Sequence, residues 1–272
     1  MRNLQIYCGC LNNKNLSQIK KLNYIPVGLK NNNFSKEWIR DNTLINISNK
    51  NPYYGEYTFH YWVWKNYLKD IEKGWIGFCQ YRKFWTPLEV KNQISTINDL
   101  SQSLLKNIPE SYEKYDSIIG EPFYVNQFRF SKFMKRNFKK MLYNPKFFLK
   151  KNRTIKFHFD MWHGDGNIDI AINLLEKNDR NDFNEFINTE PCFNPHNMFI
   201  CKDKEILTRY YEAIFPWLER CEKKFGFMQL QGFGLKRIYG FLAERYLSYW
   251  FQKNTNYKTM PIYFKDVADL TL

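Results

Sequence analysis

The order of apolar and polar segments in this 272-residue chain predicts an α/β protein with a mainly parallel sheet, built as one domain over residues 1–272. The first observation is a helical pattern between two strand-like runs with short connections, the order typical of parallel strands. The second is a content of 44% hydrophobic and 19% aromatic residues, which is enough for a substantial core. The third is a basic, aromatic segment at residues 122–159, which we expect to be a helical insertion.

The N-terminal half is expected to alternate between strands and a helix. Residues 31–51 are rich in Asn and predict a long loop, ordered because apolar residues are scattered through it. Asn51 and Pro52 predict a helix start with Asn51 as the N-cap, and apolar residues then recur at helical spacing as far as Ile71. The strands or extended pieces expected in this half cover residues 4–7, 24–27 and 75–79.

The C-terminal half is expected to continue the same alternation. Asn167 is a plausible N-cap for the first helix there, and Asp203 for a later helix that Pro216 should kink. The expected helices include residues 167–176 and 232–252, and the expected strands cover residues 117–119, 197–201 and 260–264.

The cysteines and the apolar runs predict where the protein works. Six cysteines are scattered along the chain, and Cys8 and Cys10 are separated by one residue rather than the two of redox and zinc motifs. They predict buried free thiols in a reducing cytoplasm rather than a metal site. No apolar run reaches the length of a signal peptide's central segment or of a membrane span. We therefore expect a cytoplasmic protein, attached peripherally to the inner face of the cell membrane.

Much of the formal net charge of +14 lies in the segment at residues 122–159, which has eleven cations and no acidic residue. Such a segment favours phosphate-bearing partners: nucleic acid, anionic lipid or a polyanionic substrate. A solvated basic face over core aromatics is the alternative. The cations are Arg129, Lys132, Lys135, Arg136, Lys139, Lys140, Lys146, Lys150, Lys151, Arg153 and Lys156.

Four separated blocks carry a resemblance to a known family. Residues 40–66 read RDNTLINISNKNPYYGEYTFHYWVWKN, and residues 75–85 read WIGFCQYRKFW. Residues 195–218 (PHNMFICKDKEILTRYYEAIFPWL) and 238–250 (IYGFLAERYLSYW) follow in the same order. Together they resemble a family of bacterial capsular and exopolysaccharide glycosyltransferases that was long catalogued as a domain of unknown function. Its first block reads D-x-T-G-x-N-I-S-x-K-N-x-x-Y-x-E-x-T, and its strand ends in H-Y-R-R-Y.

Three positions depart from the family's pattern. This chain has Gln80 where the family has His, Lys83 where it has a second Arg, and Leu44 where it has Gly. The resemblance covers roughly residues 4 to 264 and implies a GT-A-like, nucleotide-sugar-binding fold. It also implies transfer of a sugar from a nucleoside-diphosphate donor, with a UDP-sugar favoured, to a growing capsular or surface polysaccharide. We expect a lipid-linked acceptor on a polyprenyl diphosphate, close to an anionic membrane surface.

Two functions from other classes stay open. The basic aromatic segment would suit a nucleic-acid-binding protein, but no recognisable DNA- or RNA-binding motif accompanies it, and nucleic acid is not the expected partner. A non-catalytic scaffold at the membrane surface is the other alternative.

The end of the strand at residues 75–79 is the first candidate for donor binding. The diphosphate of a nucleotide sugar gains charge as the sugar leaves, and fixed cations or a metal must neutralise it. Tyr81, Arg82 and Lys83 are expected to do part of this, since Arg contacts phosphate in a bidentate manner and Lys acts as a point charge. A structural ion pair between Arg82 and an acidic residue such as Glu56 is the alternative.

The start of the helix predicted at Asn51, before this strand, supplies more donor-binding candidates. Asn46, Lys50 and Asn51 precede a helix N-terminus, where backbone N–H groups favour anions. Glu56 is expected either to grip a sugar hydroxyl or a cation or to complement the helix dipole. Tyr7, in the first predicted strand, completes the donor-binding set.

Two carboxylates are the candidates for catalysis. Asp165, in the turn WHGDGNID, and Glu244, on the last long helix, would each accept a proton from the acceptor as a general base. For Asp165 an Asx-turn is the equal alternative, and for Glu244 a solvated ion pair with Arg245. Small residues four positions before and after Glu244 predict close approach of its helix face to another surface. His163, Asn197 and Arg245 are further site candidates.

The cofactor is left open. No D-x-D pattern follows the strand, so no metal ligand is predicted, although a divalent Mn or Mg ion would be compatible with the resemblance.

We predict that the basic segment binds anionic membranes. Each cation near such a surface contributes about 1 kcal/mol, so a few of the eleven suffice for reversible attachment. Replacing Lys135, Arg136, Lys139 and Lys140 by Gln should release the protein from anionic liposomes at low salt while activity on a soluble acceptor persists. Liposome binding that is absent in the parent, or undiminished after the four changes, would contradict this.

Overall fold

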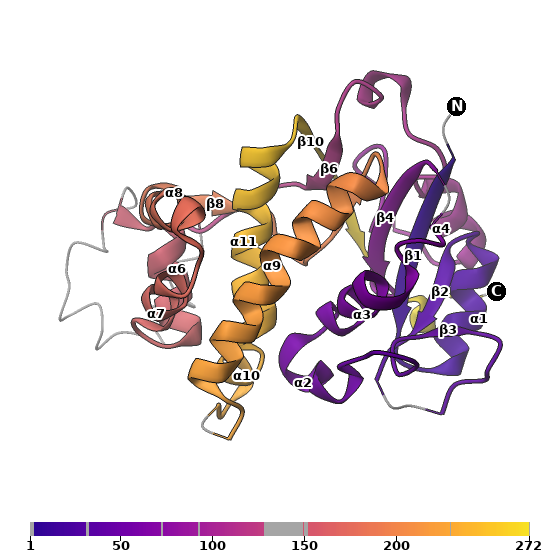
Figure 1. Cartoon of the computed structure of the whole chain (residues 1–272). Coiled ribbons are helices and arrows are strands. Elements are labelled where there is room, and N and C mark those ends of the chain that lie inside the picture. The colour runs from indigo at the N-terminus through magenta and orange to yellow at the C-terminus, as the bar shows by residue number, and fades with distance from the viewer. Residues whose placement is uncertain are drawn as a thin grey trace.

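The computed structural model describes residues 3–30, 33–71, 73–91, 93–127, 149, 152–228 and 230–271. It shows one mixed sheet, a smaller helical lobe, and two long helices that cross each other between the sheet and the lobe (Figure 1). Most of the basic segment, residues 128–148, 150 and 151, lies outside the described residues. No helix of the described part is long and apolar enough to cross a membrane.

The central sheet confirms the α/β prediction, as a mixed and largely parallel sheet in the order β10-β6-β9-β4-β1-β2-β3. Strand β1 pairs in parallel with both β2 and β4, whereas β9 is antiparallel to its neighbours β4 and β6. Strand β5 forms a hairpin with β4 and pairs with the C-terminal β11. The strands are β1 (Leu4–Cys10), β2 (Ile25–Gly28), β3 (Ile39–Arg40), β4 (Trp75–Gln80), β5 (Lys83–Trp85), β6 (Ser117–Gly120), β9 (Phe199–Cys201), β10 (Tyr257–Met260) and β11 (Ile262–Phe264).

The helices divide between the two sides of the molecule. Helices α1 (Asn13–Lys21) and α4 (Ile97–Ser103) lie with the sheet, together with α2 (Asn51–Tyr54) and α3 (Tyr57–Trp62). Helices α6 (Ile155–His163), α7 (Asn167–Asn173) and α8 (Lys177–Thr189) form the lobe, beside the two-stranded ribbon of β7 (Phe123–Tyr124) and β8 (Cys192–Phe193). Helices α9 (Lys204–Phe225) and α11 (Ile238–Asn254) run between lobe and sheet, with the short α10 (Phe233–Lys236) before α11 (Figure 1).

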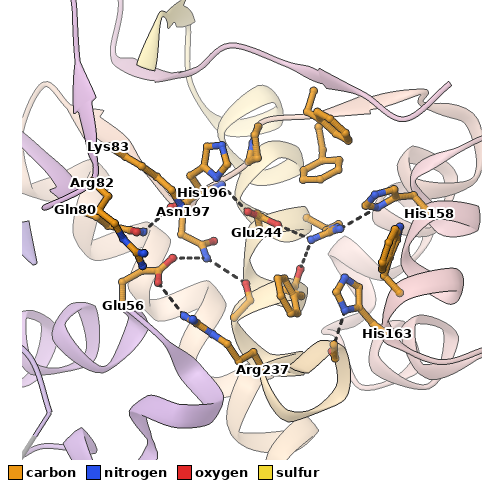
Figure 2. A pocket seen from close by; sticks show the side chains of 18 residues that line it. Glu56, Gln80, Arg82, Lys83, His158, His163, His196, Asn197, Arg237 and Glu244 are labelled. Carbon is orange, nitrogen blue, oxygen red and sulfur yellow. Dashed lines mark hydrogen bonds and ion pairs between the residues drawn. The ribbon is translucent and has the colours of Figure 1, made fainter. Parts of the chain in front are cut away.

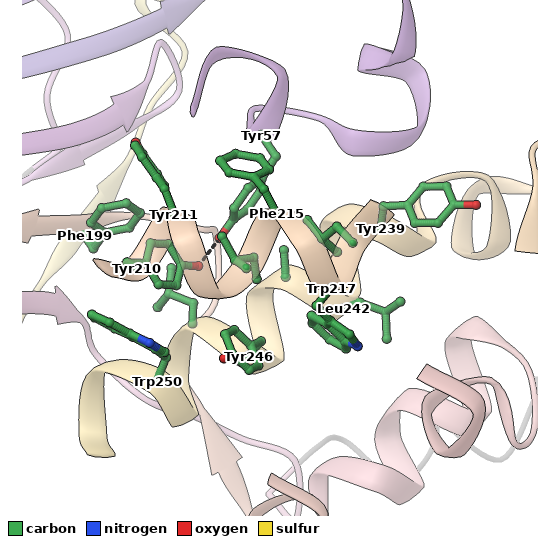
Figure 3. Close-up of a cluster of buried hydrophobic side chains, with 14 of the residues drawn as sticks. Tyr57, Phe199, Tyr210, Tyr211, Phe215, Trp217, Tyr239, Leu242, Tyr246 and Trp250 are labelled. Atoms are coloured by element: carbon green, nitrogen blue, oxygen red, sulfur yellow. Dashed lines mark hydrogen bonds between the residues drawn. The ribbon is translucent and has the colours of Figure 1, made fainter. Parts of the chain in front are cut away.

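Helices α9 and α11 carry the larger of two buried clusters. Aromatic rings from α3, α9, α11 and the sheet interlock there, and the Tyr57 and Tyr210 hydroxyls hydrogen-bond to each other inside it (Figure 3). The second cluster fills the opposite face of the sheet under α1 and α4. The described cysteines are free thiols, and Cys8, Cys10, Cys79, Cys201 and Cys221 are buried.

Most expected elements exist with shifted ends. Asp203 does cap α9, its carboxylate accepting a hydrogen bond from the Ile206 N–H at 3.0 Å, and the helix continues through Pro216. The loop expected at residues 31–51 contains strand β3, and Pro261 divides the C-terminal strand into β10 and β11. The last helix divides at Arg237 into α10 and α11.

Two N-cap predictions are wrong. Asn51 is the first residue of α2, and its side-chain amide donates to the Gly55 carbonyl at 2.8 Å and to the Thr58 hydroxyl at 3.0 Å. The cap of α7 is Gly166, with φ +74°, and the Asn167 amide instead donates to the His163 carbonyl. In both places the amide donates to a carbonyl at the C-terminal end of a helix, α2 and α6 respectively, and does not cap a helix N-terminus.

The segment after Asn51 is also less regular than its apolar spacing predicts. Gly55 adopts φ +62° and ends α2 after one turn, and α3 then passes into a π-helical turn over Val63–Tyr67. His60 and Val63, on the same helix face as Glu56, are fully buried. Both faces of this segment therefore pack against protein. The position of Glu56 follows from these tertiary contacts and not from a regular helix.

Buried Asp41 anchors this segment. Its carboxylate accepts a hydrogen bond from the Thr58 hydroxyl at 2.6 Å, and Thr58 accepts the bond from Asn51. Burial raises the pKa of Asp41 to about 6, above the ordinary value near 3.8. The folded state then holds a proton that the unfolded chain has lost, so this contribution to stability is full below about pH 4 and is lost as the pH rises to about 6.

We predict that Asp41→Asn, which removes the ionisation and keeps the shape, removes this pH dependence. The difference in unfolding free energy between the parent and the variant should shift by on the order of 3 kcal/mol between pH 4 and pH 7, with the parent losing stability. Urea denaturation across this range measures it, with the exposed Asp70→Asn as the control. A difference that stays constant with pH would contradict the prediction.

Candidate functional site

A pocket of about 620 Å³ opens where strand β4 ends, between the sheet and the helical lobe (Figure 2). Its size is that of a small-molecule site, and its place at a strand's carboxyl end is where α/β proteins bind ligands. Helix α11 forms its floor. It is lined by Glu56, Gln80, Arg82, Lys83, Phe123, His158, Trp162, His163, Phe193, Pro195, His196, Asn197, Gly234, Arg237, Gly240, Phe241, Glu244 and Arg245.

One side of the pocket is cationic. Arg82 lies in the β4–β5 hairpin with its side chain 58% exposed, and Lys83 is the half-buried first residue of β5. Burial lowers the pKa of Lys83, against the raising influence of Glu56 and Glu244. Arg237 approaches from the connection between α10 and α11. Three cations from two distant parts of the chain therefore share one wall.

Glu56 belongs to the same wall and is held from two sides. Its Oε1 accepts a hydrogen bond from Asn197 Nδ2 at 2.9 Å, and its Oε2 lies 3.5 Å from Arg237 Nη2. A Cβ at Gly55 would stand 2.3 Å from that Nη2, so the glycine before Glu56 makes room for Arg237. Arg82 Nε lies 4.0 Å from Asp266 Oδ2, so the ion pair considered as the alternative forms with Asp266 rather than with Glu56.

The floor is formed by Glu244 and Arg245, whose side chains are 12% and 1% exposed. Glu244 Oε1 accepts a hydrogen bond from the His196 backbone N–H, and its Oε2 lies 2.5 Å from Arg245 Nη1. Burial raises the pKa of Glu244, while Arg245 and the His196 N–H act against that rise. The pair is buried, so the solvated ion pair considered as an alternative is wrong.

The face of α11 around Glu244 is closely packed, as its small residues predict. A Cβ at Gly240 would stand 3.2 Å from the Tyr54 carbonyl oxygen. Ser248 Oγ accepts a hydrogen bond from the Asn194 N–H at 2.7 Å. The first contact sets α2 close against α11, and the second holds the chain before β9 on the same helix.

That chain segment makes an unusual turn. His196 and Asn197 have φ values of +82° and +54°, a left-handed region that costs a non-glycine residue on the order of 1–3 kcal/mol. The turn is held by Glu244 on the His196 N–H and by Gln80 Nε2, which donates to the His196 carbonyl at 3.2 Å. A strained backbone that surrounding hydrogen bonds hold in one conformation is typical of residues at functional sites.

Three of the four histidines of the chain line the pocket, and all three are neutral near pH 7. Burial lowers the pKa of His163 and of His196 to about 3, assisted by Arg245 and Lys83 respectively. Burial lowers the pKa of His158 as well, with Arg245 as the next cause. The cationic character of the pocket therefore comes from its Arg and Lys side chains.

The structure brings seven of the predicted site residues into the pocket: Glu56, Arg82, Lys83, His163, Asn197, Glu244 and Arg245. Tyr7 lines a small adjoining cavity that shares Glu56, Gln80 and Asn197 with the pocket. Tyr81 packs partly against the second core cluster, with the Arg82 guanidinium 4.9 Å from its ring centre.

Four predicted residues lie elsewhere. Lys50 pairs with Glu222 at 2.7 Å in a different depression, and Asn46 folds back on its own turn to accept from the Ser48 N–H. Asn51 holds the turn at Gly55, and Asp165 is exposed in the turn between α6 and α7. Among the two predicted bases, only Glu244 faces the pocket.

Sequence reasoning missed Arg237, His158, Trp162 and His196. The scarcity of histidine was an unused signal, since three of only four lie here. His196 also stands inside the block PHNMFIC. Arg237 and Trp162 carry no local pattern, because only tertiary packing brings α6 and the α10–α11 connection to the strand end.

The side chains of the pocket offer few ligands to a metal ion. Glu56 and Glu244 each already face an arginine, and no three His, Cys, Asp or Glu side chains gather into a metal-binding group among the described residues. The groups available for phosphate charge are the cations Arg82, Lys83 and Arg237.

Comparison with known proteins gives one family and one fold. The sequence profile described as "Domain of unknown function (DUF4422)" matches residues 5–255. No curated protein matches the chain. A solved structure described as the WbbM bifunctional glycosyltransferase in its apo form superposes with a TM-score of 0.70 at 19% identity, over 97% of this chain. The match spans 45% of the WbbM chain, and at this identity it shows a shared fold.

Proposed function

The chain belongs to the DUF4422 family, and from its pocket and its glycosyltransferase-like fold we propose that it is a glycosyltransferase of bacterial capsular or surface polysaccharide assembly. It moves a sugar from a nucleoside-diphosphate donor, with a UDP-sugar favoured, to a growing glycan. The observation that carries the proposal is a pocket at the end of β4 in which three cations share one wall and a buried carboxylate forms the floor.

The cationic wall suits the donor's diphosphate. Arg82 and Arg237 offer planar guanidinium groups that contact phosphate oxygens in pairs, and Lys83 adds a point charge on the same wall. Fixed cations stabilise the charge that grows on the diphosphate as the sugar leaves, and they need no reorganisation at that moment. Glu56, held by Asn197, supplies a carboxylate for sugar hydroxyls at the same wall.

Glu244 is our proposed base. Figure 2 shows it between the labelled residues of the cationic wall and His158 and His163 on the opposite side. In a direct displacement the acceptor hydroxyl oxygen bonds to the anomeric carbon, the bond from that carbon to the diphosphate breaks, and its electron pair leaves with the nucleotide. The hydroxyl proton passes to Glu244, whose buried carboxylate has a raised pKa and is thereby a stronger base.

The acceptor's carrier is proposed from sequence alone. The basic segment would bring the enzyme to an anionic membrane that presents a polyprenyl-diphosphate-linked glycan. The mechanism proposed above uses no divalent Mn or Mg ion. The nucleic-acid-binding and scaffold alternatives rest on the same segment, and detectable turnover of a nucleotide sugar separates the proposed enzyme from both.

We predict that nucleotide sugars stabilise the protein through the cations. A thermal-shift screen should find a donor that raises Tm, since a ligand that binds the folded state stabilises it by mass action. Arg82→Ala should weaken that donor about three- to tenfold, the modest size reflecting its solvent exposure. Binding and turnover should survive EDTA to a substantial degree.

Arg209→Ala, an exposed arginine on α9, is the matched control and should leave donor affinity unchanged. Unaltered affinity in a folded Arg82→Ala protein would remove Arg82 from the donor site. Near-complete loss of activity on chelation, restored by Mn²⁺, would show that carboxylates hold a cation, with Glu56 and Asp165 the first to test.

We predict that Glu244→Gln lowers turnover by about two to four orders of magnitude while donor binding stays nearly intact. Glutamine keeps the hydrogen bond from the His196 N–H but accepts no proton. The variant should also lose the acidic limb of the pH–rate profile, which a purely structural role would leave in place.

Glu212→Gln, an exposed carboxylate on α9, is the control for this change. If Glu244→Gln retains full turnover, the proton goes to another group. Asp165→Asn, run in parallel, then tests the second carboxylate that the sequence suggested.

A further inference from the structure

The half of the pocket opposite the cations has a different chemistry, which binding of a diphosphate does not use. It is an aromatic wall contributed by α6, α11 and the β7–β8 ribbon. Ring centres of its members lie 4.1 to 6.4 Å apart where they contact one another. The members are Phe123, His158, Trp162, His163, Phe193 and Phe241.

The aromatic wall is held rigidly in place. His163 stacks on Phe241 with ring centres 4.1 Å apart, and its Nδ1–H donates to the Gly234 carbonyl at 2.9 Å. A Cβ at Gly234 would stand 2.1 Å from the Trp162 carbonyl oxygen, so α10 presses directly on the backbone that carries Trp162. Trp162 itself is half-buried, and its ring lines the pocket. The surface is therefore formed before any ligand arrives.

Two buried polar groups of the pocket lack hydrogen-bond partners among the described residues, one beside Glu56 and one next to Phe193 of the aromatic wall. They are Asn197 Oδ1 and Arg245 Nε, on side chains that line the pocket and belong to residues 5% and 1% exposed. A flip of the Asn197 amide, which would exchange Oδ1 and Nδ2, is ruled out because Nδ2 donates to Glu56 Oε1 and to the Gly240 carbonyl. One acceptor and one donor are left, and an unmade buried hydrogen bond is costly enough that a ligand is the natural partner.

We propose that the aromatic wall is the acceptor subsite and binds the terminal hexose ring of the glycan. A hexose has C–H groups on its faces and hydroxyls around its edge. The C–H face packs against the electron-rich face of Trp162, while hydroxyls donate to Asn197 Oδ1 and accept from Arg245 Nε. The term "acceptor" rests on the proposed function; the binding of a hexose does not.

The arrangement places the two substrates on either side of the base. The diphosphate occupies the wall of Arg82, Lys83 and Arg237, and the hexose occupies the aromatic wall. Glu244 lies on the floor between them, within reach of the hydroxyl that attacks. An isoprenoid chain is the competing occupant of an aromatic surface, but it would leave Asn197 Oδ1 and Arg245 Nε unsatisfied.

Saturation-transfer NMR on the full-length protein tests the subsite directly. The probes are methyl β-D-glucopyranoside and methyl β-D-galactopyranoside, with geranyl phosphate as the isoprenoid probe, each measured with UDP present. At least one glycoside should receive saturation, strongest at its C–H protons. Trp162→Leu should weaken that binding about three- to tenfold, and Trp162→Phe, which keeps a ring, should restore most of it.

Donor binding provides the readout that separates the two proposals. Trp162→Leu should weaken glycoside binding and leave the nucleotide-sugar affinity within about twofold. Arg82→Ala should weaken nucleotide-sugar binding and leave glycoside binding unchanged. Trp38→Leu, at a half-buried tryptophan outside the pocket, should change neither affinity. If a nucleotide sugar binds but no glycoside does, or if Trp162→Leu binds glycosides as the parent does, the subsite is wrong. Saturation of geranyl phosphate alone assigns the wall to lipid and also overturns it. If glycosides bind through Trp162 and no nucleotide sugar binds, the subsite stands and the transferase proposal fails.

Discussion

The pocket depends on the buried ion pair of Glu244 and Arg245. Arg245 is almost entirely enclosed, with its guanidinium 4.1 Å from the Phe193 ring centre and with Phe159 and Phe241 also nearby. Placing two charges out of water is expensive, and removing either partner would strand the other at a cost of about 3–5 kcal/mol. The pair is kept because it joins three parts of the molecule: α11, the strained turn at His196 and, through His158, helix α6. The cationic wall and the aromatic wall lie on opposite sides of this ion pair.

The first block of the family resemblance has a structural role more than a binding one. Asp41, Asn51 and Thr58 form a closed hydrogen-bonded set inside the protein, and the Trp62 indole donates to Thr43 at 3.0 Å. These bonds fold the long connection after β2 into a fixed platform. Glu56 is the residue of the block that lines the pocket. A recognisable sequence block can therefore mark the scaffold that presents a single functional side chain.

The sequence was informative where the physics is local. Apolar runs located β1, β4 and β6, and Asp203 identified the start of α9, because burial and capping act within a few residues. Arg82, Lys83 and Glu244 were found as chemistry-bearing residues at a strand end and on a packed helix face. Local reasoning failed where tertiary contacts decide. The amides of Asn51 and Asn167 donate to carbonyls at the C-terminal ends of α2 and α6 and cap no helix N-terminus. Arg237 and Trp162 reach the pocket only because α10 packs on α6.

The pairing of β11 with β5 links the cationic wall to the order in which the chain assembles. Lys83 pairs with Phe264, and the Lys265 and Val267 N–H groups donate to the Arg82 and Tyr81 carbonyls, so the hairpin is clamped by residues about two thirds of the chain away. Contacts of such separation are entropically expensive to close and form after local structure. A chain still emerging from the ribosome has β4 but not its clamp. The wall of Arg82 and Lys83 therefore takes its final form only once residues 262–267 have been made, and the pocket stays incomplete until then.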